Sequence, residues 1–181
     1  MAKDQRGPDH PETLLAMHNL AVSFVQAHRL DEAIPLFAEV VRLRKAKLLP
    51  DHPDTLASID GLVDADLAAG RWAEAEAAAR EGLDARTRRA PDEWSRFHTM
   101  SLLGAALAGQ KKYTQAEPLL LAGYEGLKAR EAKIPAPTRG RLRAAAARIV
   151  PFYEVWGRPD KAAEWRKRLG SPAATPPRSS P

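Results

Sequence analysis

The chain has 181 residues and a formal net charge of +5, and it contains no cysteine, which excludes disulfides and thiolate zinc sites. Its length fits one domain, and no run of residues approaches the ~20 apolar positions that a membrane-spanning helix needs. The N-terminal residues lack the apolar segment of a signal peptide, so a soluble cytoplasmic protein is expected.

A seven-residue motif occurs twice near the N-terminus. Residues 8–14 read PDHPETL and residues 50–56 read PDHPDTL, 42 positions later. Landmarks downstream follow the same shift, since Leu20 recurs as Leu62 and Ala33 recurs as Ala75. A fixed spacing with matched landmarks indicates a repeat architecture in which each unit packs on its neighbours. Two weaker copies follow, which gives units at 7–49, 50–90, 91–134 and 135–170.

Each unit is predicted to be a pair of helices. In the first unit, apolar residues recur at steps of three or four, as on one face of a helix: Leu14, Met17, Leu20, Ala21 and Phe24. Pro11 suits the first helical position, and a second helix is predicted to begin near Asp31. The later units predict helices near 53–69 and 73–89, about 94–109 and 114–131, and about 138–156 and 160–169.

The spacing of small and aromatic residues resembles a known repeat. Leu20, Ala21, Phe24, Ala33 and Phe37 form a pattern similar to that of the tetratricopeptide repeat, whereas HEAT and armadillo units of similar length space these residues differently. The 42-residue period and the PDHPxTL motif resemble the kinesin light chain variety. Residues 101–134 are also similar to repeats found C-terminal to bacterial serine/threonine protein kinases.

The resemblance covers about residues 8–169 and implies an all-α fold, a right-handed α–α superhelix (solenoid) of about four helix-turn-helix repeats. The expected organisation is an N-terminal lead-in at 1–10, a tetratricopeptide repeat domain at 11–169 and a tail at 171–181. The tail is rich in proline and serine and is expected to be disordered.

In this family the first helices of successive units line a concave groove that binds peptides. The resemblance places nine residues at such groove positions: Leu15, His18, Asn19, Val22, Asp60, Asp64, His98, Ser101 and Arg148. Some family members clamp a C-terminal carboxylate with lysine and asparagine there, but only Asn19 matches that chemistry, and Asp60 and Asp64 would repel an acidic terminus. A segment with apolar anchors and one or two basic residues is therefore expected as the ligand.

Signatures of catalysis are missing from the sequence. There is no Gly-rich phosphate loop, no Gly-x-Ser-x-Gly elbow, no His-Glu-x-x-His and no kinase signature. The chain is therefore expected not to be an enzyme and to need no cofactor. His10 and His52 lie in the repeated turn, which favours a role in the connector over metal binding.

The positive charge is concentrated in the last unit, where residues 135–170 hold 9 basic and 3 acidic side chains. Together with Trp156 and Trp165 these residues offer a surface for phosphate and stacked bases. The alternative is a solvated terminal cap whose tryptophans pack between helices, and the sequence favours that alternative over nucleic acid or an anionic surface.

The predicted function is a non-catalytic scaffold or adaptor that binds a peptide or helix of another protein in the groove. A second hypothesis is a regulatory or docking fragment of a larger signalling protein such as a serine/threonine kinase, because the chain starts almost directly in a repeat. Self-association through the uncovered N-terminal face is a third possibility. The sequence does not identify the partner.

Overall fold

The computed structural model describes residue 7 and residues 9–170, and this part of the chain is helical, without strands. The helices are α1 (Pro11–Gln26), α2 (Leu30–Lys47), α3 (Pro53–Ala68), α4 (Trp72–Arg89), α5 (Trp94–Gly109), α6 (Tyr113–Ala129), α7 (Gly140–Val155) and α8 (Pro159–Leu169). Two short 3₁₀ helices, η1 (Glu131–Lys133) and η2 (Ala136–Thr138), connect α6 to α7. The predicted all-α fold of helix pairs is confirmed, and the tail at 171–181 lies outside the described residues.

The repeated motif builds the same helix start twice. His10 and His52 are the N-caps of α1 and α3, and their Nδ1 atoms accept hydrogen bonds from the backbone N–H groups of Glu12 and Asp54 at 3.3 and 3.2 Å. A proline follows each histidine at the first helical position, where the missing N–H has no intrahelical partner to lose. The two histidines therefore act in the connector, as a helix cap.

The turn inside each helix pair is also repeated. It contains one residue in the left-handed backbone region, with φ between 55° and 73°: His28, Gly70, Lys111 and Gly157. Glycine adopts this conformation without a steric penalty, whereas a residue with a Cβ atom is strained there. The four units thus reverse the chain by the same geometry, although only two of them use glycine.

Small residues allow the helices to pack closely. The alanine position of the repeat, Ala33, Ala75, Ala116 and Ala162, is at most 1% exposed in every unit. In the third unit a Cβ atom on Gly104 would lie only 2.9 Å from the backbone nitrogen of Leu120. Glycine therefore allows α5 and α6 to approach each other closely at this position.

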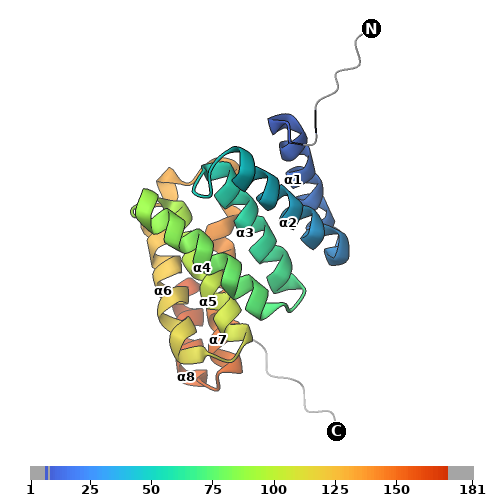
Figure 1. Cartoon of the computed structure of the whole chain (residues 1–181). Coiled ribbons are helices and arrows are strands. Elements are labelled where there is room, and N and C mark those ends of the chain that lie inside the picture. The colour runs from blue at the N-terminus through green and yellow to red at the C-terminus, as the bar shows by residue number, and fades with distance from the viewer. Residues whose placement is uncertain (1–6, 8, 171–181) are drawn as a thin grey trace.

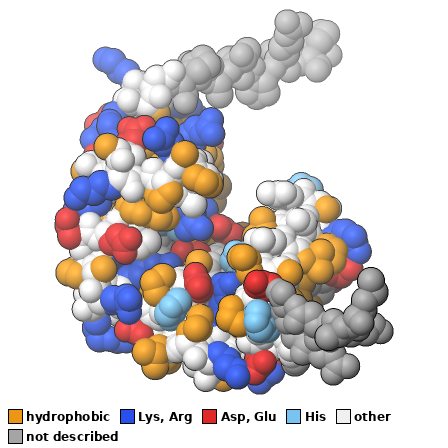
Figure 2. All heavy atoms as spheres, turned by 90° about the horizontal axis from the view of Figure 1, so that it is seen from above, with side chains coloured by type: hydrophobic (Ala, Val, Ile, Leu, Met, Phe, Trp, Pro, Cys, Tyr) orange, Lys and Arg blue, Asp and Glu red, His pale blue; other side chains and the backbone are white. Residues whose placement is uncertain are grey.

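The helices stack in chain order into a curved solenoid (Figure 1). The first helices α1, α3, α5 and α7 contact one another in sequence, while the second helices α2, α4, α6 and α8 each pack against the first helices. Viewed from above, the molecule has the shape of a C around a central hollow (Figure 2). The first helices line the inner, concave face of this curve.

The first unit lacks a neighbour on its N-terminal side among the described residues. Leu20 on α1 is 48% exposed, whereas its counterparts in the next two units are half-buried (Leu62 on α3) and 2% exposed (Leu103 on α5). At the other end of the stack Trp165 is buried and packs its ring edge-on against Tyr124, with centroids 5.7 Å apart. The tryptophans of the last unit therefore belong to the packing of the stack.

Candidate functional site

The concave face contains two hollows. The polar hollow, about 430 Å³, lies between α1 and α3 and is also reached from α2 and α7; it is lined by His18, Val22, Val25, Gln26, Phe37, Ala57, Gly61, Asp64 and Arg141. The apolar hollow, about 390 Å³, lies between α5 and α7, with two residues of α6 at its base. Its lining is Ala105, Ala108, Gly109, Tyr113, Leu120, Ala147, Arg148, Pro151, Phe152 and Val155.

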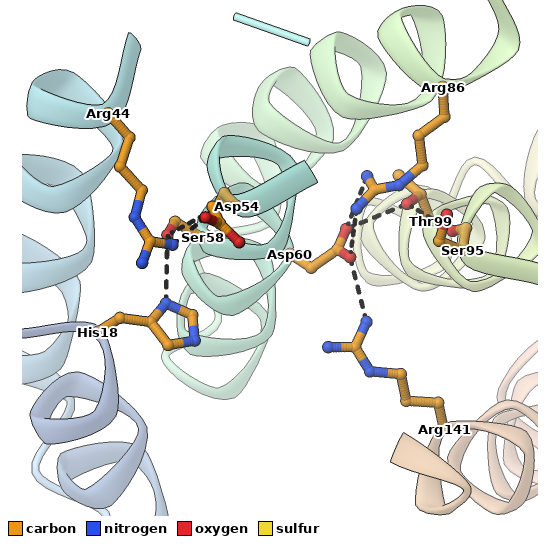
Figure 3. A network of polar contacts seen from close by, with 9 residues as sticks. All are labelled: His18, Arg44, Asp54, Ser58, Asp60, Arg86, Ser95, Thr99 and Arg141. Atoms are coloured by element: carbon orange, nitrogen blue, oxygen red, sulfur yellow. Dashed lines mark hydrogen bonds and ion pairs between the residues drawn. The ribbon is translucent and has the colours of Figure 1, made fainter. Parts of the chain in front are cut away.

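A buried ion-pair cluster lies next to the polar hollow and is centred on Asp60 of α3, which is fully buried. Arg86 of α4 donates two hydrogen bonds to the Asp60 carboxylate, at 3.2 and 2.8 Å, and Thr99 of α5 donates a third at 3.0 Å. Arg141 of α7 donates a fourth at 3.2 Å (Figure 3). Gly82 leaves the space for Arg86, because a Cβ atom there would lie 3.2 Å from its Nη1.

A second cross-groove contact lies two turns further along α7. Arg148 approaches Asp64 of α3 at 3.4 Å and donates a hydrogen bond to the hydroxyl of Ser101 on α5 at 3.3 Å. The Asp64 side chain is 45% exposed, but protein surrounds it at the floor of the groove. This desolvation raises the pKa of Asp64, and the charge of Arg148 opposes the shift.

His98 of α5 is 2% exposed. Neither of its ring nitrogens has a hydrogen-bond partner among the described residues. Burial, and then the positive charges of Arg141, Arg148 and Arg86, hold the pKa of His98 well below its usual value. The imidazole is therefore neutral at physiological pH.

On the other side of the polar hollow, Arg44 of α2 is buried between α2 and α3. Its Nη1 donates to the Ser58 hydroxyl and to the backbone carbonyl of Asp54, both at 2.7 Å. The Nδ1 atom of His18 lies 3.2 Å from the same hydroxyl (Figure 3). The His18 ring also packs edge-on against Phe37, with centroids 5.4 Å apart.

The structure divides the nine predicted groove residues into three groups. His18, Val22 and Asp64 line the polar hollow, and Arg148 lines the apolar hollow. Leu15 and Asn19 are exposed on α1 outside both hollows. Asp60, His98 and Ser101 are at most 2% exposed, and arginines of α7 donate hydrogen bonds to Asp60 and Ser101, so a direct contact of these three residues with a partner stays a prediction.

Sequence reasoning missed several residues of this site, namely Arg44, Arg86, Thr99 and Arg141. A signal for two of them exists, since Arg44 and Arg86 are 42 positions apart, in the register of the repeated motif. It also missed the hydrophobic residues Pro151 and Val155 at the apolar hollow.

A family model described as tetratricopeptide repeat matches residues 1–46 and 26–88. Residues 1–88 thus carry the pattern of the tetratricopeptide repeat. No curated protein matches this chain.

Solved structures extend the likeness over almost the whole chain. Two crystal structures of kinesin light chain nearly identical TPR-like repeats from Podosopora anserina, one of them a Q17M variant, are 24% identical to it. They match 93% of this chain and 78% of their own, with TM-scores of 0.70 for the variant and 0.67 for the other. The BtubC (BKLC) protein from P. vanneervenii is 14% identical, with a TM-score of 0.70 over 99% of this chain and 72% of its own. These likenesses show that the fold is that of kinesin light chain-like repeats.

Two further observations concern the described residues of this protein. None of their helices is long and apolar enough to cross a membrane. No group of three or more His, Cys, Asp or Glu side chains among them could hold a metal ion.

Proposed function

We propose that the chain is a non-catalytic scaffold or adaptor that binds a peptide or helix of another protein on its concave face. Tetratricopeptide repeats are in general protein–protein interaction scaffolds. The observation that carries the proposal is the apolar hollow between α5 and α7. Val155 at this hollow is 72% exposed, and an exposed large apolar side chain beside an apolar hollow suits an anchoring contact with a partner.

The charges of the groove bear on what it binds. The sequence suggested that Asp60 and Asp64 repel acidic ligands, but both carboxylates are already paired with arginines of this chain. Paired carboxylates exert little net attraction on a basic ligand and little repulsion on an acidic one. An apolar side chain in the apolar hollow, next to Arg148, is therefore the central element of the proposed contact.

The second hypothesis, a regulatory or docking part of a larger signalling protein such as a kinase, is supported by the exposure of Leu20 on α1. The equivalent leucines of the second and third units are half-buried and buried. A preceding unit, or a second copy of this chain, would cover Leu20. Light scattering on wild type and on Leu20→Glu tests self-association, since a dimer through this face would dissociate in the variant.

Nucleic acid or an anionic surface is the least favoured ligand, because basic residues of the last unit are engaged within the protein. Lys161 pairs with Glu117 at 2.5 Å, Arg168 pairs with Glu125 at 2.6 Å, and Arg166 pairs with Glu154. Trp165 is buried, so it offers no face for a stacked base. The cytoplasmic location expected from the sequence stays a prediction.

The experiment is a peptide-display selection on the immobilised wild-type chain, followed by affinity measurement on two matched variants. Ala147→Trp on α7 fills the apolar hollow, whereas Ala77→Trp places the same ring on an exposed position of α4, away from both hollows. We expect selected peptides to carry large apolar residues and to lose at least about tenfold in affinity with Ala147→Trp only. Equal binding by the wild type and both variants would place the binding surface elsewhere and reject the proposal.

A further inference from the structure

Two neighbouring units carry the same three-residue arrangement with one chemical difference. In the second unit, Arg86 and Thr99 both donate to the carboxylate of Asp60. The corresponding positions of the preceding unit lie 42 residues earlier for Arg86 and Asp60, where Arg44 and His18 stand. For Thr99 the corresponding position lies 41 residues earlier and holds Ser58. Figure 3 shows the two groups beside α3: Arg44 and His18 meet at the hydroxyl of Ser58, whereas Arg86, Thr99 and Arg141 meet at the carboxylate of Asp60.

The hydroxyl groups confirm that the two arrangements correspond. The Ser58 hydroxyl donates to the carbonyl of Asp54, four positions earlier, at 3.2 Å. The Thr99 hydroxyl makes the same bond to Ser95 at 3.1 Å. The second unit thus has an arginine, a hydroxyl and a carboxylate, while the first has an arginine, a hydroxyl and an imidazole.

The first unit consequently contains a buried cation without a close ion-pair partner, and the nearby charge that acts on it is the carboxylate of Asp54. Arg44 is 5% exposed, and no carboxylate among the described residues forms an ion pair with it. Its hydrogen bonds go to neutral oxygens of Ser58 and Asp54. A buried charge is costly unless it is paired, and the corresponding Arg86 has its counter-charge in Asp60.

The space for a counter-charge lies in front of His18, in the polar hollow. Its Nδ1 atom is engaged with Ser58, and its Nε2 atom makes no hydrogen bond to another described residue. Arg141 and Asp64 line the same hollow. The cations exceed the anions here, because four guanidinium groups surround the groove floor (Arg44, Arg86, Arg141 and Arg148) and three carboxylates lie among them: Asp60 and Asp64, which are paired, and Asp54, whose charge acts on Arg44 and His18.

We propose that the polar hollow is a subsite for a carboxylate, supplied by an aspartate or glutamate side chain of the segment that binds in the groove. The carboxylate contacts the Nε2 side of His18 and the guanidinium of Arg141, and it provides the first unit with the negative charge that Asp60 provides in the second. The source of the carboxylate rests on the proposed function, whereas the affinity of the hollow for a carboxylate does not.

The subsite responds to pH through His18. In the free protein, burial and then the charges of Arg44 and Arg141 lower the pKa of His18, while Asp54 raises it. The carboxylate of Asp64, which is paired with Arg148, also faces the hollow. A bound carboxylate favours the protonated imidazole, so binding tightens as the pH falls toward the pKa, and binding in turn raises that pKa.

Acetate serves as the probe, because it presents a carboxylate and needs no identified partner. The histidine rings are followed by NMR during pH titration of the full chain in acetate and in chloride of equal ionic strength. We expect acetate to raise the pKa of His18, where one unit corresponds to about tenfold tighter binding to the protonated form. The ring signals of His28, exposed in the turn after α1, serve as the internal control and should be the same in both salts.

The matched variant is His18→Asp, which gives the first unit the carboxylate of the second. We expect its thermal midpoint to rise above that of wild type, and the stabilisation of wild type by acetate to disappear in the variant. His18→Gln is the second variant; it keeps the size of the side chain without the charge, and it should also lose the response to acetate.

Three outcomes overturn the proposal. They are an unchanged His18 pKa in acetate, an acetate response that survives in both variants, and a response to inorganic phosphate without one to acetate, which assigns the hollow to a phosphoryl group. Failure of the peptide selection together with a positive acetate result would reject the groove-binding function and leave the carboxylate site in place.

Discussion

Arg141 of α7 donates a hydrogen bond to the carboxylate of Asp60 of α3 at 3.2 Å, although 81 positions separate the two residues. Helix α5 lies between α3 and α7 in the series of first helices, so this contact skips one repeat unit. Arg148 and Asp64 make a second contact of the same kind. The two arginines therefore join the second unit to the fourth across the concave face, and they hold the curvature of the solenoid.

The contribution of this contact can be measured with Arg141→Met, which keeps the length of the side chain and removes its charge. We expect the free energy of unfolding to fall by about 1–2 kcal/mol, because Asp60 loses one charged hydrogen bond but keeps Arg86. Chemical denaturation gives the value. Arg143→Met, at an exposed position of the same helix, is the control and should change stability by less than ~0.5 kcal/mol.

Asp60 itself is expected to be one of the most sensitive residues of the chain. Asp60→Ala leaves the buried guanidinium of Arg86 without its counter-charge and removes the acceptor of Arg141 and Thr99. Removal of one partner of a buried ion pair costs about 3–5 kcal/mol. Urea denaturation followed by circular dichroism measures this loss, and a change below ~1 kcal/mol would show that the cluster is not a stabilising element.

The repeats could be predicted from the sequence because local patterns determine them. The Asp-His-Pro turn, the apolar spacing and the alanine positions each act within one unit or between adjacent units, and the helices follow them closely. The covering of Asp60 and Ser101 could not be predicted in this way. It depends on Arg141 and Arg148 of the last unit, and the curvature that brings them over the groove is the sum of small rotations along the whole stack.

Asp66 is a buried carboxylate at a core position of the repeat. It occupies a core position that Leu107 fills in the third unit, and it is 2% exposed with its Oδ1 atom lacking a hydrogen bond. Arg71 approaches that atom at 3.4 Å, but burial outweighs this attraction and raises the pKa of Asp66. The ionised carboxylate therefore opposes folding.

We expect Asp66→Leu to stabilise the protein by roughly 1–3 kcal/mol at pH 7, since a well-packed apolar residue often improves on a strained buried pair. The folded-state pKa of Asp66 lies above its unfolded value, so its penalty grows as pH rises above about 4 and the benefit of the variant should shrink toward pH 3. Thermal unfolding at both pH values tests this. Asp84→Leu, at an exposed position of α4, should give no such gain.

His98 gives the opposite dependence on pH. Its folded-state pKa lies well below 6.5, so at pH 5 to 6 the unfolded chain binds a proton at this position and the folded chain does not. Stability should therefore decrease as pH falls below about 6.5. His98→Leu removes an imidazole without hydrogen bonds, so we expect the variant to be more stable than wild type. Its free energy of unfolding should also depend less on pH, with a slope lower by up to ~1.4 kcal/mol per pH unit. An unchanged slope in calorimetry between pH 5 and 7.5 would contradict this assignment.

Glu76 on α4 joins its helix to the turn between α5 and α6. Its carboxylate accepts hydrogen bonds from Lys112 at 2.8 Å, from Arg80 at 2.7 Å and from Gln110 at 2.7 Å. These bonds, that of Lys112 first, lower the pKa of Glu76 from 4.5 to about 2. A lowered carboxyl pKa contributes stability that is present above pH 4.5 and is lost as pH falls toward 2.

We expect Glu76→Gln to lose about 1–2 kcal/mol at pH 7, because the cations around the site lose a charged acceptor and partial exposure limits the effect. The difference from wild type should narrow progressively in urea denaturation at pH 4 and pH 3. Glu81→Gln on the same helix is the matched control. Its ion pair with Lys45 is 46% and 34% exposed, so the variant should change stability by no more than ~0.5 kcal/mol at any of these pH values.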